Sequence, residues 1–247
     1  MGIKYHVNEN FFGMWGHKMA YVLGYWYADG SLEDASYLRG KYIRVTSVER
    51  YIIEKIKNWM DSKHTVVSLK PTLPNGKKRY LLRIGSHKLY DTLISLGLYP
   101  KKSLTIQFPF VPKEYIYDFI RGYLDGDGCV HLQKSRGIKK KIIVKKLSVI
   151  FTSGSRLFLE KLNHILRKFA GVSQDKVYRG QRAFQLRYGT LDSIKVFKFL
   201  YQNTSDDLFF KRKFIIFIKY FRLRPIRIDD EIRILMAHNN HWAKRRI

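Results

Sequence analysis

Two stretches of similar sequence decide the fold: Val-Leu-Gly-Tyr-Trp-Tyr-Ala-Asp-Gly at residues 22–30 and Ile-Arg-Gly-Tyr-Leu-Asp-Gly-Asp-Gly at residues 120–128. Each is typical of the last turns of a helix that ends on an acid and a glycine. Small residues four apart lie above one another on a helix and let a second helix axis approach closely. These residues are Gly24 and Ala28 in the first copy and Gly122 and Gly126 in the second. The two helices are therefore predicted to pack on each other through Gly24 and Gly122.

The acids Asp29 and Asp127 each precede a glycine, Gly30 or Gly128, that suits the left-handed residue after a helix. A carboxylate at a helix C-terminus opposes the macrodipole, at a cost of about 0.3 to 1 kcal/mol. If the helices pair in parallel, both carboxylates and several free carbonyls converge into an all-oxygen site of the kind that Mg²⁺ prefers. The alternative is that Asp-Gly is only a turn dipeptide.

Both stretches resemble the motif of the LAGLIDADG homing endonucleases, in that family's double-motif, single-chain arrangement, and the resemblance covers essentially the whole chain. The first copy departs at its sixth position, where Tyr27 replaces the usual acid that Asp125 supplies in the second. That position does not bind metal in the family.

The resemblance implies an α+β fold of two tandem αββαββα repeats related by pseudo-twofold symmetry, whose antiparallel sheets form a DNA-binding saddle. It implies a monomeric, intron-encoded, site-specific endonuclease that hydrolyses one phosphodiester per strand of double-stranded DNA and leaves short 3′ overhangs. Asp29 and Asp127 would bind two or more Mg²⁺ ions, together with the main-chain carbonyls of Ala28 and Gly126. Mn²⁺ would substitute for Mg²⁺, and Ca²⁺ would bind without supporting cleavage.

The resemblance also points to a lysine just past the last helix or loop of each repeat, which corresponds to Lys102 and Lys213. These lysines would position water or balance charge in the transition state. The alternative is ordinary phosphate contact, which accounts for most protein–DNA hydrogen bonds. Ser47 and Ser153 close the second strand of each repeat, where the family often carries a polar residue that positions water.

Net charge gives independent support for a polyanionic partner. The 247 residues carry 47 Lys and Arg against 20 acids, a formal net charge of +27. Lys and Arg gain affinity for nucleic acid by displacing counterions from phosphates. The alternatives are a solvated basic surface or an anionic membrane, but no basic amphipathic helix stands out. The lone Cys129 excludes an internal disulfide and is interpreted as a buried strand residue.

Apolar periodicity and turn residues predict the same order of elements twice: helix, strand, strand, helix, strand, strand, helix. The predicted elements of the first repeat are residues 17–28, a strand before a partner at 42–47, and then 48–60, 65–72, 79–85 and 86–96. Those of the second are residues 113–126, 129–134, 142–152, 155–170, 176–179, 183–188 and 191–201. A short helix is also predicted at residues 229–238.

The duplication is visible in the letters, because residues 44–56 match residues 150–162. Predicted domains are an N-terminal repeat at residues 1–110, a C-terminal repeat at 111–221 and a basic extension at 222–247. The second repeat has a longer hairpin, rich in lysine.

An antiparallel ribbon fits the major groove and presents every second side chain to base edges. Candidate DNA-binding residues are Arg39, Lys41, Arg44, Lys70, Arg79, Arg83, Lys134, Arg136, Lys139, Lys140, Lys141, Lys146, Arg179, Arg182, Gln185 and Arg187. Their alternative is a solvated strand face.

A binding module on the same fold, either an intron RNA maturase or a non-cleaving DNA-binding regulator, is the alternative function. No run of eighteen apolar residues and no secretory segment is present, which predicts an intracellular protein with access to DNA, in the cytoplasm or an organelle matrix.

Overall fold

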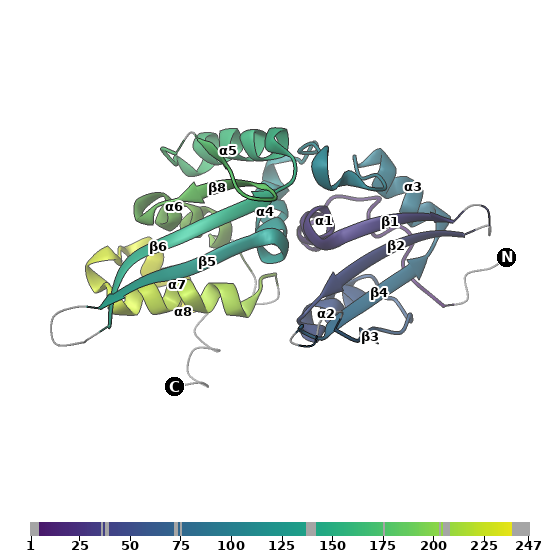
Figure 1. Ribbon diagram of the computed structural model, residues 1–247, viewed down its shortest axis with the longest axis horizontal. Helices are drawn as coiled ribbons and strands as arrows, with labels where there is room; N and C mark the ends of the chain where they lie inside the picture. Colours follow the sequence, from purple (N-terminus) through teal and green to yellow (C-terminus); the bar gives the residue numbers. More distant parts are fainter. Residues whose placement is uncertain are drawn as a thin grey trace. The chain divides into compact units, whose positions relative to one another are not determined.

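The computed structural model describes residues 5–238, apart from 36, 38–39, 72–73, 75, 137–141, 175, 203 and 205–207. The chain divides into two compact units, Met1–Gly126 and Asp127–Ile247. Each unit holds one four-stranded antiparallel sheet with its helices (Figure 1). The predicted α+β class with two antiparallel sheets is confirmed.

The first unit follows the predicted order, and its sheet has the strand order β1-β2-β4-β3. Its elements are α1 (His17–Asp29), β1 (Gly30–Ala35), β2 (Gly40–Ser47), α2 (Arg50–Trp59), β3 (Val67–Leu69), β4 (Arg79–Gly85), α3 (His87–Ser95), the 3₁₀ turns η2 (Lys102–Leu104) and η3 (Lys113–Tyr115), and α4 (Ile116–Asp127). β3 is shorter than the predicted strand.

The second unit repeats this sheet as β5-β6-β8-β7. Its elements are β5 (Gly128–Arg136), β6 (Ile142–Ser153), α5 (Arg156–Ala170), β7 (Val177–Arg179), β8 (Phe184–Tyr188), α6 (Thr190–Tyr201), α7 (Lys211–Leu223), η5 (Pro225–Arg227) and α8 (Asp230–His238). The helix that opens the second repeat in sequence, α4, belongs to the first unit up to Gly126.

Alternating side chains explain why each sheet has one covered and one open face. On β2, Ile43 and Val45 are fully buried, and their cross-strand partners Ile84 and Leu82 are fully buried as well. The helices α2 and α3 pack against this sheet. Period-two alternation therefore leaves the residues between them on the opposite face.

A serine starts one helix in each repeat. Ser86 Oγ accepts from the backbone N–H of Leu89 at 3.1 Å before α3, and Ser155 Oγ accepts from Phe158 at 3.3 Å before α5. Left-handed glycines end two elements, with φ of +90° at Gly97 and +66° at Gly171. These local signals are readable in the sequence, which is why the predicted boundaries lie close to the observed ones.

The helix α7 was not predicted. It packs against β5 and β6, and its Phe214, Phe217 and Phe221 surround Phe197 of α6 with ring centroids 4.9 to 5.9 Å apart. This aromatic cluster extends the core of the second unit. The helix begins with three basic residues, Lys-Arg-Lys, but the residues that follow form a buried apolar face.

The described part of the C-terminal extension folds back on the second unit. α8 packs against α6, with Ile232 fully buried (Figure 1). Lys198 of α6 donates to Asp229 at 2.5 Å and pairs with Glu231 at 2.8 Å. The helix predicted at residues 229–238 is confirmed, and residues 239–247 lie outside the described part.

Candidate functional site

The helices α1 and α4 are in backbone contact at their glycines. A Cβ added to Gly24 would lie 2.0 Å from the carbonyl oxygen of Phe119, and one added to Gly122 would lie 2.0 Å from that of Tyr21. A Cβ added to Gly126 would lie 2.4 Å from the Cβ of Ala28. Contacts rise together in residue number along both helices, so within the first unit the helices run parallel.

Parallel packing brings the end of α4 to the end of α1. Asp29, the last residue of α1, is half-buried, and its Oδ2 would lie 3.5 Å from a Cβ on Gly126. Asp127 is the exposed last residue of α4. Asp29 therefore lies beside the C-terminal carbonyls of two helices, where a cation is favoured.

The glycines that follow these acids are not left-handed, which corrects the prediction. Gly30 has φ −87° and ψ 156°, and Gly128 is not among the positive-φ glycines of the described residues. Each glycine opens a strand directly, without a capping turn. Gly30 is required for space instead, because a Cβ there would lie 2.3 Å from the Trp26 ring.

A buried lysine lies at each helix end. Lys102 is 6% exposed and its Nζ donates to the Tyr27 carbonyl at 2.7 Å, whereas Lys213 is 4% exposed and donates to the Gly128 carbonyl at 2.6 Å. An ammonium group beside these carbonyls offsets the unfavourable placement of an acid at a helix C-terminus. Burial also distinguishes these two lysines from the exposed lysines that suit phosphate contact. Lys213 lies in the first turn of α7, not in a loop.

The buried phenol of Tyr25 adds a group that the sequence did not single out. Burial raises the pKa of Tyr25, and the negative charge of Asp29 raises this pKa further. Its phenol therefore stays protonated beside Asp29 at neutral pH. Tyr25 lies within the first motif, four residues before Asp29. The sequence did not show that its phenol is buried and interacts with the Asp29 carboxylate.

Ser47 and Ser153 have matching structural roles. Ser47 Oγ accepts from the Glu49 N–H at 3.2 Å, and Ser153 Oγ accepts from the Ser155 N–H at 3.1 Å. Each serine thus forms the turn between the second strand and the following helix. Their proposed water-positioning role stays a prediction.

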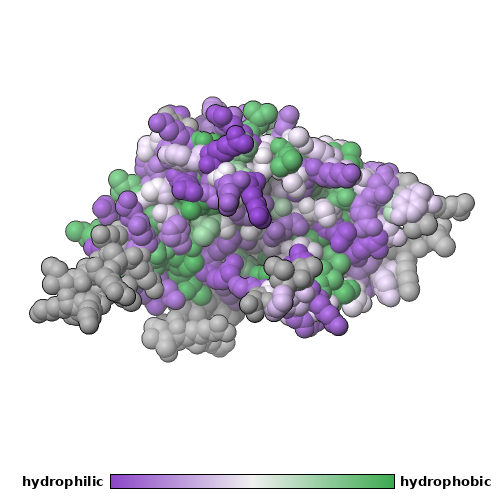
Figure 2. Space-filling view, in the orientation of Figure 1, coloured by the Kyte–Doolittle hydropathy of each residue, from purple (hydrophilic) through white to green (hydrophobic). Residues whose placement is uncertain are grey.

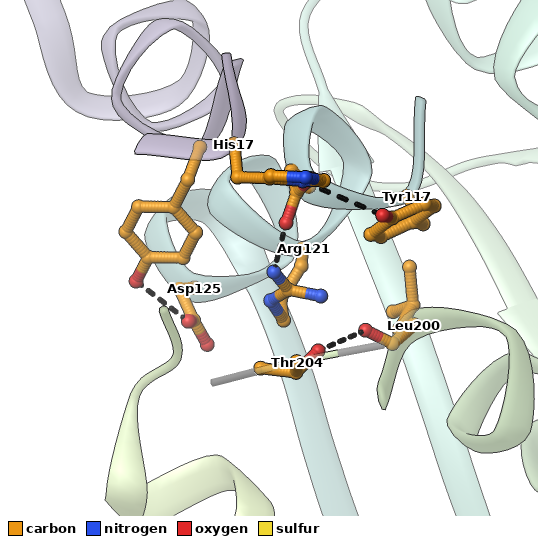
Figure 3. A network of polar contacts seen from close by, with 8 residues as sticks. His17, Tyr117, Arg121, Asp125, Leu200 and Thr204 are labelled. Carbon is orange, nitrogen blue, oxygen red and sulfur yellow. Dashed lines mark hydrogen bonds and ion pairs between the residues drawn. The ribbon is translucent and has the colours of Figure 1, made fainter. Parts of the chain in front are cut away.

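A second polar cluster joins the other ends of α1 and α4 (Figure 3). His17 Nδ1 contacts the Asp118 carboxylate at 2.8 Å and the Tyr117 hydroxyl at 3.4 Å, and Asp118 pairs with Arg121. Asp118 and Arg121 are fully buried. Burial raises the pKa of Asp118, while Arg121 and then His17 oppose that rise. The apolar spacing of α4 did not predict this cluster.

The open face of the first sheet carries three of the candidate base-reading residues. Arg44 and Arg83 pair across β2 and β4, and Arg79 lies on the same face of β4. The prediction that Lys41 reads bases is corrected. Lys41 lies on the same, covered face as Ile43 and Val45, and it pairs with Asp91 at 2.7 Å.

On the second sheet, Lys146, Gln185 and Arg187 lie on the open face. Arg179 is exposed but pairs with Phe184, on the side of the sheet that holds buried Leu186, and its role as a reader stays a prediction. Lys70 and Arg182 lie outside the strands. The side chains of Lys134 and Arg136, and all of Arg39, Lys139, Lys140 and Lys141, lie outside the described part of the chain.

Several residues on the open faces of the sheets were not predicted to lie there. Glu33 and Tyr42 face outward on the first sheet, and His131, Gln133 and Tyr178 are exposed on the second. Cys129 is exposed, not buried, because it alternates with the buried Val130. Figure 2 shows hydrophilic side chains over much of one face of the described surface, in line with the high net charge.

The described residues contain no group of three His, Cys, Asp or Glu side chains that could hold a metal. Mg²⁺ is commonly bound by one or two carboxylates with water completing its shell. Asp29 and the neighbouring helix-end carbonyls form a hard oxygen donor set of that kind. The residues present therefore fit a divalent metal.

Among the described helices, none is both long and apolar enough to cross a membrane.

Solved structures with the same fold cover nearly all of this chain. I-LtrWI, a LAGLIDADG homing endonuclease bound to target DNA, is 11% identical with a TM-score of 0.57, covering 94% of this chain and 99% of its own. The homing endonuclease I-WcaI, bound to its DNA recognition sequence, is 14% identical with a TM-score of 0.55, covering 81% and 89%. These likenesses show the fold of double-motif LAGLIDADG proteins.

Sequence comparison adds a match to a family model over part of the chain. Residues 114–200 match the family described as LAGLIDADG-like domain. This match lies within the second repeat, and the resemblance to LAGLIDADG proteins seen in the two motifs is confirmed.

Two curated proteins named probable translation initiation factor IF-2 also match. The protein of Methanocaldococcus jannaschii is 26% identical over 171 residues, and that of Thermococcus kodakarensis is 35% identical over 101 residues. These matches cover 67% and 38% of this chain but 12% and 8% of those proteins. The chain therefore spans about a tenth of the length of these relatives.

Proposed function

We propose that this protein is a site-specific, metal-dependent endonuclease of double-stranded DNA that hydrolyses one phosphodiester in each strand and leaves short 3′ overhangs. The observation that carries the proposal is the end of the packed helix pair, where Asp29 adjoins α4 and a buried lysine lies in each unit. The fold and the net charge of +27 support a DNA partner.

The proposed metal ligands are the carboxylates of Asp29 and Asp127 and the carbonyls of Ala28 and Gly126. Two or more Mg²⁺ ions bound there would supply an activated water, neutralise charge on the phosphate and stabilise the leaving 3′ oxygen. Mn²⁺ is expected to replace Mg²⁺ in cleavage, and Ca²⁺ is expected to support binding only.

The protein's own residues perform the positioning. Asp29 ends α1 beside Gly126 of α4, so its carboxylate is carried by a helix end and not by a loop. Lys102 and Lys213 are held by main-chain carbonyls and would place positive charge near the phosphate as negative charge builds. The open faces of the sheets would read bases, and exposed lysines and arginines would contact phosphates.

The full chain is proposed to act as a monomer, because it already contains two copies of the motif. Each repeat would supply one acid to one DNA strand. This arrangement needs no second copy of the chain to cut both strands.

The experiment begins with selection of a bound site from a randomised duplex library in Ca²⁺. The selected duplex is then incubated in Mg²⁺, in Mn²⁺ and in EDTA with the wild type, Asp29→Asn and Asp127→Asn. Both variants are expected to bind as the wild type does and to make no double-strand break. Selective binding without cleavage by the wild type would favour a non-cleaving regulator, and selection of RNA over duplex DNA would favour a maturase.

A further inference from the structure

Two arginines occupy matching places on the open faces of the two sheets. Arg83 of β4 pairs in register with Arg44 of β2, and Arg187 of β8 pairs in register with Ile150 of β6. Residues 44 and 150 are themselves equivalent in the internal repeat. Arg83 and Arg187 are therefore repeat partners.

Arg83 is held along one edge and on one face of its guanidinium group. Its Nε lies 3.2 Å from Oε2 of Glu33 and its Nη2 lies 2.9 Å from Oε1. Its Cζ lies 3.5 Å from the centroid of the Tyr42 ring. Arg44 joins the same acid through Nη1, at 3.3 Å from Oε2. Glu33 thus orients two arginines in the middle of the open face.

Arg187 is held by the same edge of its guanidinium but by a neutral group. Its Nε and Nη2 lie 2.8 Å and 2.5 Å from Oε1 of Gln185. Gln185 is two residues earlier on β8, so both side chains share the open face. The two repeats therefore fix equivalent arginines with different partners: Glu33 lies on β1, two strands away from Arg83, and Gln185 lies on the same strand as Arg187.

Structural stabilisation does not explain the Glu33 cluster. The side chains of Arg44, Arg83 and Glu33 are 39%, 40% and 35% exposed. Ion pairs this accessible to water add little to folding stability. An acid in the centre of a positively charged open face also weakens non-specific attraction to phosphates, so its presence calls for another role.

The geometry of guanidinium supplies that role. Its five N–H donors form a rigid fork, and engagement of the Nε and Nη2 edge leaves the terminal edge, Nη1 with the second Nη2 hydrogen, for a ligand. Two parallel donors of this kind match O6 and N7 of guanine in the major groove. Fixing the fork in advance lowers the entropy that binding must remove.

We infer that Arg83 and Arg187 each read a guanine, one in each half of the DNA site, and that Glu33, Tyr42 and Gln185 are positioning residues for this contact. The inference rests on the proposed DNA-binding function and deepens it. Glu33 acts through Arg83 and does not read a base itself. Gln185 would perform the same task for Arg187 with a single neutral side-chain oxygen.

The test compares sites selected from a randomised duplex library in Ca²⁺ by the wild type, Arg83→Lys and Arg187→Lys. Lysine keeps the charge but removes the fork, so phosphate contacts and salt dependence should persist. Each variant should lose guanine preference at one base pair, in opposite halves of the site. The loss in a guanine-against-adenine competition should be roughly 5- to 150-fold.

Variants of Glu33 separate positioning from direct reading. Glu33→Ala should weaken preference at the Arg83 base pair, whereas Glu33→Gln should largely restore it. Tyr42→Phe keeps the ring and is the matched control, with Tyr42→Ala as the variant that loses preference. Thermal unfolding should be nearly unchanged in the Glu33 variants and in Tyr42→Phe, because the Glu33 side chain is accessible to water and phenylalanine keeps the ring.

Several results would overturn the inference. Guanine preference that survives Arg83→Lys and Arg187→Lys would do so, and so would a cytosine preference that disappears in Glu33→Ala while guanine preference stays. A wild type that enriches no sequence would also overturn it. Selective binding without cleavage would reject the endonuclease and leave this inference standing, because the selection measures binding alone.

Discussion

The hydroxyl of Tyr21 in α1 donates to Oδ2 of Asp125 in α4 at 2.8 Å. This hydrogen bond joins the two packed helices at a buried position. In the first motif the equivalent of Asp125 is Tyr27, whose hydroxyl instead donates to the Leu96 carbonyl at 2.7 Å. The sixth positions of the two motifs therefore serve different neighbours: one ties helix to helix, and the other ties α1 to the end of α3.

We expect Tyr21→Phe to destabilise the fold by about 1 to 3 kcal/mol, because it removes a buried donor from a carboxylate. The measurement is chemical unfolding of the whole chain. Tyr27→Phe is the comparison, with a smaller expected effect of about 0.5 to 1.5 kcal/mol because its acceptor is a neutral carbonyl. Equal stability of Tyr21→Phe and the wild type would contradict this account.

Gly24→Leu and Gly122→Leu should each destabilise the protein by at least about 1 to 3 kcal/mol, because backbone lies where the new side chain would begin. A Cβ at either position would sit 2.0 Å from a carbonyl oxygen that cannot move away without separating the helices.

Gly189→Ala serves as the control for these glycines, since nothing lies within 4 Å of a Cβ there. Thermal unfolding of the three variants should rank the control nearest to the wild type. A Gly24→Leu variant as stable as the control would show that the helices do not depend on this contact.

The order of helices and strands was predictable because it depends on local signals. The isoleucines of α2 recur at helical spacing, and Ser86 and Ser155 cap their helices through side chains three residues from their partners. The internal match between residues 44–56 and 150–162 added a second copy of the same evidence. The order found in one repeat could thus be checked against the other.

Features that depend on pairing between distant segments were not predictable. Cys129 is exposed because of the register of β5, and Lys41 faces α3 because of the register of β2. The sequence showed alternation in each strand but not which face the helices cover. Glu33 was overlooked because its partners, Arg44 and Arg83, lie on other strands.

The two buried lysines lead to a prediction about catalysis under the proposed function. Lys102→Met and Lys213→Met keep the apolar stem but remove the charge, so cleavage of the selected duplex should slow by about 10²- to 10³-fold. Each variant leaves a buried carbonyl, that of Tyr27 or Gly128, without its lysine donor, so stability should fall by about 1 to 3 kcal/mol, and cleavage is measured at a temperature at which the variants are folded.

Lys101→Met is the matched control, since Lys101 is the exposed neighbour of Lys102. Its cleavage rate should stay within a few-fold of the wild type. If Lys102→Met cut as fast as Lys101→Met, the buried ammonium would have a structural role only.

The Glu33 cluster predicts a pH dependence with a definite sign. Hydrogen bonding to Arg83 holds the pKa of Glu33 below its usual value of 4.5. For an acid with a lowered folded pKa, the contribution to stability is present above the unfolded pKa and is lost as pH falls through the folded value. The carboxylate should therefore hold Arg83 at neutral pH and release it only below pH 4.5.

NMR titration of the Glu33 carboxyl group measures this shift directly. The pKa should return toward 4.5 in Arg83→Gln, because the principal hydrogen-bond partner has been removed. An unaltered pKa in that variant would mean that Arg83 is not the cause of the shift.

The packing of α4 also decides how the chain can be divided into fragments. α4 opens the second repeat in sequence, yet up to Gly126 it belongs to the first compact unit. A fragment ending at residue 112 would leave the glycine face of α1 in water, whereas one ending at residue 126 keeps its partner helix. The shortest piece of the N-terminal half that can be expected to express as a soluble protein is therefore longer than one repeat.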